Sequence, residues 1–153
     1  MFEVSNSVQS KKDQVLTGTI TCFEKKVFHA SNPKKDDFDA IRFAITIDGP
    51  LGPIEIAEAV PPRISHVKSK KRRGTKMVEE YSSATRLVLA LGLVTLDELP
   101  TLVADPERVA AIGEAARQLA ADKTPVTFRS TERVSKGGQV FIGIDLDSVK
   151  IKA

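Results

Sequence analysis

Apolar and polar residues alternate along five stretches of the chain, and this period of two predicts β-strands with one face toward a core. The stretches are rich in β-branched residues and are separated by segments that contain glycine, proline or asparagine. The predicted strands are 16–23, 38–48, 54–60, 125–134 and 139–151. Gly18 lies inside the first of them, where a glycine is typical of a bend that lets one strand pair with two neighbours in a small barrel.

The period changes between the third and fourth predicted strands, where residues 82–121 show the apolar spacing of helices. Ser82 or Ser83 can cap the first helix, because a serine side chain accepts a hydrogen bond from an amide of the first turn. Asp105 at a cap position, followed by Pro106, predicts the start of a second helix. The sequence therefore predicts a mainly β fold with a helical insertion between strands three and four.

Composition indicates a folded chain. With 153 residues, the chain is long enough to bury an ordinary core without disulfide or metal cross-links. Its residues are 41% hydrophobic and 28% charged, so it has neither the high net charge nor the biased composition of a disordered protein. Residues 1–14 are polar and show no period. We expect them to form a loose N-terminal arm ahead of a single domain at 15–153.

Charge is concentrated in one segment, although the net charge of the whole chain is only +3. Residues 63–76 contain seven lysines and arginines and no carboxylate, which favours a polyanion as partner. Gly74 indicates a mobile loop that orders on the polyanion; a solvated loop without any partner is the alternative. The phosphate-binding candidates are Lys68, Lys70, Lys71, Arg72, Arg73 and Lys76 in this run, Lys34 and Lys35 between strands one and two, and Lys136 between strands four and five.

The chain offers little for catalysis or for metal binding, and we expect neither an enzyme nor a cofactor. Cys22 is the only cysteine and falls on the predicted core face as a buried thiol, while His29 and His66 are too far apart in sequence to indicate a zinc site. A magnesium-dependent nuclease is the enzymatic alternative, since clustered carboxylates hold magnesium. Its candidate ligands are Asp36, Asp37 and Asp39, or Asp145 and Asp147.

Three strands, a helical insertion and two strands follow the order of the OB-fold, and closing such a sheet removes its exposed edges. In this layout the chain resembles the phage-type single-stranded DNA-binding proteins over roughly residues 15–151. The resemblance is carried by the glycine-bent strand LTGTITCF, the basic segment KSKKRRGTK and the terminal hairpin VTFRSTERVSKGGQVFIGIDLDSVKI. It implies a closed five-stranded barrel that binds a single strand across one face and between the loops that join strands one to two and four to five.

OB-folds bind single strands by combining a positive groove for the phosphates with aromatic or guanidinium surfaces on which bases stack. Alternation places a set of such side chains on the outer face of the predicted sheet. They are Phe23, Phe38, Arg42, Arg129, Arg133 and Phe141. The same side chains could instead pack beneath the inserted helices. An outward position in the alternation does not show whether a side chain contacts a ligand or is covered by a helix.

The function predicted from the sequence is sequence-tolerant binding of single-stranded DNA in replication or recombination. Replication or recombination proteins, or a second copy in a homodimer, are further expected partners. We expect a cytoplasmic location without membrane contact, in the host if the chain is phage-encoded, because no secretory pattern opens the sequence and no apolar stretch approaches about 20 residues. The alternatives are a protein-interaction or dimerisation module and a single-stranded RNA binder.

Overall fold

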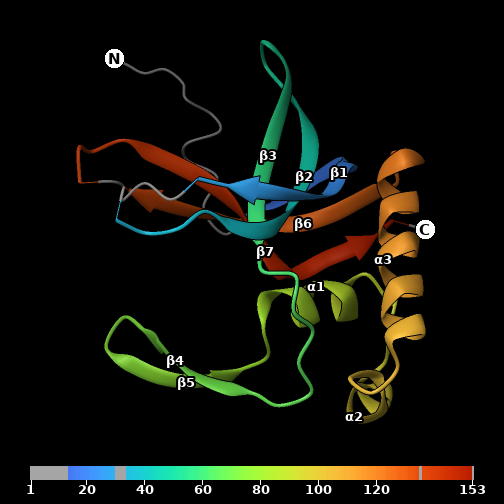
Figure 1. Cartoon of the computed structure of the whole chain (residues 1–153). Helices are drawn as coiled ribbons and strands as arrows, with labels where there is room; N and C mark the ends of the chain where they lie inside the picture. The colour runs from blue at the N-terminus through green and yellow to red at the C-terminus, as the bar shows by residue number, and fades with distance from the viewer. Residues whose placement is uncertain (1–13, 30–33, 135, 153) are drawn as a thin grey trace.

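Five strands form one antiparallel sheet in the computed structural model, which describes residues 14–29, 34–134 and 136–152. Their order across the sheet is β3-β2-β1-β6-β7 (Figure 1). The strands are β1 Val15–Phe28, β2 Phe38–Gly49, β3 Gly52–Val60, β6 Pro125–Val134 and β7 Val140–Ile151. All five predicted strands are therefore confirmed, although β1 continues to Phe28, five residues beyond the predicted end at Phe23.

The helices lie between β3 and β6, as the change of period predicted. They are α1 Ser83–Ala90, the 3-10 helix η1 Leu96–Glu98, α2 Leu99–Leu102 and α3 Pro106–Ala121. The Ser82 side chain accepts a hydrogen bond from the Thr85 amide, and the Asp105 side chain accepts one from the Arg108 amide, so both predicted caps are confirmed. Within the described part of the chain, no helix has the length and apolar character needed to cross a membrane.

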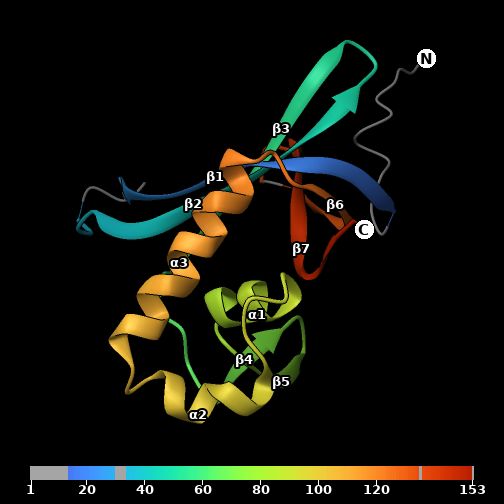
Figure 2. The same cartoon turned by 90° about the vertical axis from the view of Figure 1, so that its right-hand side faces the viewer.

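The core lies between the inner face of the sheet and the helices. α1 packs against β7 and α3 against β1, as the two views show (Figures 1 and 2). Phe43 of β2, Phe128 of β6 and Leu87 of α1 are fully buried there. The apolar positions that alternate along the strands thus meet part of the apolar faces of α1 and α3 in one cluster, and Leu99 and Ile112 belong to a second cluster among the helices.

A β-bulge in β1 changes which side chains reach this core. The pairing of β1 with β2 shifts register between Ile20 and Cys22, so Thr21 is an extra residue and every later side chain changes face. The prediction that Phe23 lies on the outer face is therefore wrong: Phe23 is 9% exposed, and its ring meets that of Phe43 edge-on at 6.5 Å between centroids. Cys22 moves to the outer face, half-buried, so the predicted core thiol is wrong as well.

The predicted closed barrel is also wrong, because β3 and β7 are the two edges of the sheet and no ladder among the described residues joins them. A side chain spans the junction instead: the Glu58 carboxylate of β3 accepts a hydrogen bond from the Ile144 amide of β7, with 2.9 Å between oxygen and nitrogen. Gly143 makes room for this contact, since a Cβ there would overlap the Glu58 carboxylate and lie 2.7 Å from the Thr131 hydroxyl oxygen.

The N-terminal arm predicted at 1–14 lies outside the described residues, apart from Gln14. The Gln14 carbonyl accepts a hydrogen bond from the Ser130 amide of β6, at 3.0 Å between nitrogen and oxygen. The chain therefore already runs alongside β6 one residue before β1 begins.

Candidate nucleic-acid interface

The basic segment forms a second, two-stranded antiparallel sheet that stands apart from the first (Figure 1). It consists of β4 Ser69–Arg73 and β5 Lys76–Glu80, and we term it the basic arm. Gly74 lies in the two-residue turn between the strands at a φ of +65°, which glycine adopts without steric cost. A hairpin thus takes the place of the predicted mobile loop.

The charge of the basic arm is balanced at its base and unbalanced at its tip. Near the base, Lys70 stands opposite Glu79, and the Lys68 ammonium lies 5.3 Å from the centroid of the Tyr81 ring. Toward the tip the cross-strand pairs are Lys71 with Val78, Arg72 with Met77 and Arg73 with Lys76. The side chains of the lysines and of Arg72 are exposed, whereas that of Arg73 lies outside the described part of the structure. The tip therefore presents cations without a cross-strand carboxylate.

The β6–β7 hairpin carries the second group of predicted residues. Arg129 is exposed and pairs in register with Asp145, while Phe141 is 41% exposed and pairs with Arg133. Lys136, in the turn that joins these strands, is exposed. The side chain of Arg133 lies outside the described part of the structure. The outward placement predicted for Arg129 and Phe141 is consistent with their exposure.

A groove of about 600 Å³ lies between the basic arm and the β6–β7 hairpin, which both extend to the left in Figure 1. Its lining includes two cations, Lys71 and Arg86. Four carboxylates also line it: Glu58, Glu80, Asp145 and Asp147. Arg86 is held in place, because its guanidinium lies 3.4 Å from the Asp147 carboxylate and also donates to the Tyr81 carbonyl. The lining of the groove therefore carries more carboxylates than cations, which disfavours phosphates inside it.

Predicted residues at the β1–β2 end form a separate group. Phe38 is 50% exposed, and its ring stacks on that of Phe28 with 5.7 Å between centroids and 16° between planes. Lys34 and Lys35 are exposed in the segment that leads into β2. Phe28 is not among the predicted residues, because the alternation in the sequence ends at Phe23 and a polar stretch follows it. The stacked pair offers a single aromatic surface beside two lysines.

Arg42 lies on the outer face as predicted, but its charge is already matched. Its guanidinium forms an ion pair with Glu55 of the neighbouring strand. Hydrogen bonds to Glu55 and to Cys22 raise the pKa of Arg42 above its ordinary value. Arg42 thus holds β2 to its neighbours and is a weaker candidate for phosphate than the cations at the tip of the basic arm.

The predicted residues therefore do not form one continuous surface. The basic arm holds five of them and Lys68 immediately precedes it, the β6–β7 hairpin holds four, and the β1–β2 end holds three, while Phe23 is in the core and Arg42 is engaged within the sheet. Arg86 and Glu58 were not predicted from the sequence, because each contributes to the groove through a partner far along the chain.

Neither metal chemistry nor a known relative adds to this picture. In the described ranges, no group of three or more His, Cys, Asp or Glu side chains could hold a metal ion. No protein-family model, curated protein or solved structure matches the chain.

Proposed function

We propose that the protein binds single-stranded DNA without strong sequence preference, with the basic arm as its main phosphate contact. The observation that carries the proposal is the unbalanced tip of the arm, where Lys71, Arg72 and Lys76 are exposed and no carboxylate stands opposite them. Proteins that neutralise phosphates release condensed counterions, so such a cluster supplies affinity for any sequence.

The order of the strands supports an OB-like sheet as the framework of this proposal. The order β3-β2-β1-β6-β7, with helices inserted between the third and fourth strands of the sheet, matches that of a five-stranded OB-fold, whose barrel is partly open. In such folds the loops that join strands one to two and four to five border the ligand. Here these are the segment that includes Lys34 and Lys35 and the turn that includes Lys136.

The bases would stack on the β6–β7 hairpin while the arm contacts the backbone. Phe141 offers an aromatic face and Arg129 a guanidinium, two groups on which bases of any sequence stack. The four carboxylates that line the groove disfavour phosphates inside it, so the backbone would follow the exposed cations of the basic arm. We propose that the protein acts in the cytoplasm and coats strands exposed during replication or recombination.

The test is a titration of fluorescently labelled oligo-dT, followed by anisotropy at several salt concentrations, beside a duplex and an oligo-U of equal length. We expect micromolar or tighter binding of oligo-dT at low salt, weaker binding of the duplex, and a linear fall of log affinity with log salt. Preference for the duplex, or binding weaker than micromolar at low salt, would contradict the proposal. Tighter binding of oligo-U would assign the site to RNA instead.

A further inference from the structure

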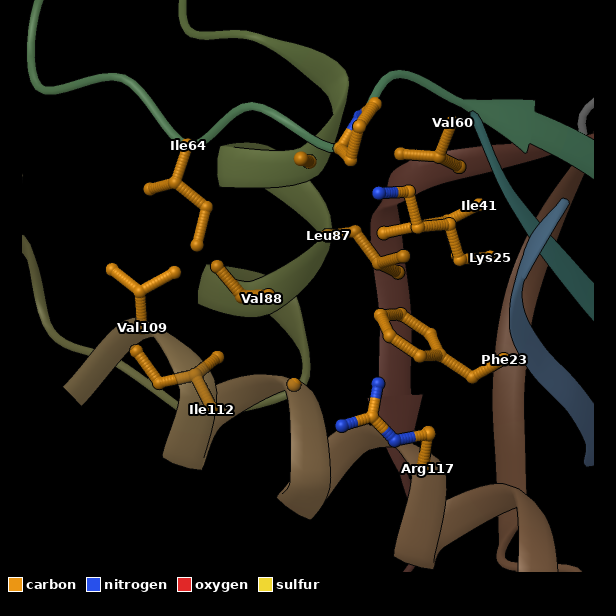
Figure 3. A pocket seen from close by; sticks show the side chains of 13 residues that line it. Phe23, Lys25, Ile41, Val60, Ile64, Leu87, Val88, Val109, Ile112 and Arg117 are labelled. Carbon is orange, nitrogen blue, oxygen red and sulfur yellow. The ribbon is translucent and has the colours of Figure 1, made fainter. Parts of the chain in front are cut away.

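An apolar pocket lies on the helical side of the molecule, between α1, α3 and strands β1 and β2 (Figure 3). Its volume is about 140 Å³. The buried side chains of Phe23, Leu87, Val88 and Ile112 line it. An apolar cavity of about 150 Å³ stays dry and takes up benzene. The pocket therefore has the size and the lining for one ring or one short alkyl chain.

Gly113 lines this pocket from the interior of α3, where only proline is a poorer helix former than glycine. The backbone does not require it, since its φ is not positive. Packing does not require it either: the atoms nearest to an added Cβ would be the two terminal guanidinium nitrogens of Arg117, at ordinary contact distances of 3.7 and 3.8 Å. The absent side chain instead leaves space in the wall of the pocket.

Two cations and no carboxylate are among the residues that line the pocket. Lys25 comes from β1 and Arg117 from α3, and Figure 3 shows the Arg117 guanidinium next to the Phe23 ring. The Lys25 ammonium lies 3.9 Å from the Asp39 carboxylate, and Arg117 forms an ion pair with Glu114. Exposed ion pairs of this kind contribute little to stability, so both cations can turn to another anion at small cost.

We propose that this pocket binds a small amphipathic carboxylate. Its ring or alkyl chain lies between α1 and α3, and its carboxylate contacts Arg117. Charge complementarity selects against an amine of the same size, whose ammonium would lie beside the Arg117 guanidinium. No residue of the basic arm lines the pocket, so the proposal stands or falls independently of nucleic-acid binding.

The first experiment titrates the full chain with phenylacetate, and separately with phenethylamine, and follows the amide signals by ¹H–¹⁵N correlation NMR. We expect saturable shifts in α1 and α3 with phenylacetate and none with phenethylamine. Gly113→Leu should abolish the phenylacetate shifts by filling the pocket, whereas Gly113→Ala should keep them and raise the melting temperature. Absence of saturable shifts in the wild type, or equal response to the amine, would overturn the proposal.

A second variant keeps the test decisive if Gly113→Leu does not fold. Arg117→Gln lies on an exposed position of α3 and should weaken phenylacetate binding about two- to fivefold, the effect expected for one exposed charge pair. Binding of benzyl alcohol, which has the ring without the charge, should be unchanged by the same substitution. An equal loss of affinity for both ligands would mean that Arg117 only shapes the wall of the pocket. That result would contradict the assigned contact between Arg117 and the carboxylate.

Discussion

Replacing Gly143 with alanine should weaken the junction between β3 and β7, because the new methyl group occupies the space of the Glu58 carboxylate. The backbone tolerates alanine there, since the φ of Gly143 is not positive. The nearby Thr131 hydroxyl can rotate away, but the Glu58 carboxylate can move only by releasing the Ile144 amide, to which it lies at 2.9 Å.

The expected loss follows from that hydrogen bond. A hydrogen bond to a charged group contributes about 1.5–3 kcal/mol, so Gly143→Ala should lower the free energy of unfolding by about this amount. In a Glu58→Ala background the bond is already absent, and the added methyl group meets no carboxylate. The same Gly143→Ala change should then be neutral or stabilise by up to about 1 kcal/mol, through the lower entropy of the unfolded chain.

Urea unfolding followed by far-ultraviolet circular dichroism measures the four free energies of this double-mutant cycle. Coupling of about 1.5 kcal/mol or more between the two positions is the expected result. Equal effects of Gly143→Ala in both backgrounds would refute the reasoning, since the glycine would then not be required by Glu58.

Three other predictions address the bulge, the stacking surface and pH. Phe23→Ala should cost about 3–5 kcal/mol in urea unfolding and leave oligo-dT affinity unchanged, because its ring is in the core. Phe141→Ala should instead weaken oligo-dT binding by about 1–3 kcal/mol in the anisotropy titration, and unchanged affinity with a lower melting temperature would assign Phe141 to packing. A hydrogen bond from Arg108 lowers the pKa of Glu98 below its ordinary value, so the stabilising contribution of this bond is present at neutral pH and is lost as pH falls through the folded-state pKa. Glu98→Gln should therefore reduce the melting temperature at neutral pH, and the difference from wild type should vanish in acid.

Local signals predicted most of the fold. Alternation located the strands, and the capping residues Ser82 and Asp105 located the helix starts, because both depend on neighbours within a few positions. The bulge at Thr21 has no such signal: it depends on how β1 pairs with β2, and one extra residue was enough to reverse the face assigned to Phe23. The contact that bridges the open edge likewise joins residues far apart in the chain, since Glu58 and Ile144 are separated by 86 positions.

The candidate site was predicted in its composition and not in its arrangement. The run of cations was visible in the sequence, but its hairpin form depends on pairing with the segment Lys76–Glu80, whose apolar and acidic residues show no clear period. The neutralisation of Arg42 could not be predicted, since its partner Glu55 belongs to another strand and meets it only after the sheet forms. Charge along the chain therefore predicted where exposed cations gather better than alternation predicted which aromatic and arginine side chains face outward.

The most direct test of the proposed function is the salt dependence of oligo-dT binding by Lys71→Gln/Arg72→Gln, measured by anisotropy beside Lys150→Gln/Lys152→Gln. Each variant loses two exposed cations, one pair at the tip of the basic arm and the other at the end of β7 and just beyond it. Each phosphate contact on a single strand contributes about 0.7 to the slope of log affinity against log salt. If each of the two arm cations contacts one phosphate, the slope should therefore become shallower by about 1.4 in the arm variant. The control variant should keep the wild-type slope. Equal slopes in both variants would contradict the assignment of the basic arm as the phosphate contact.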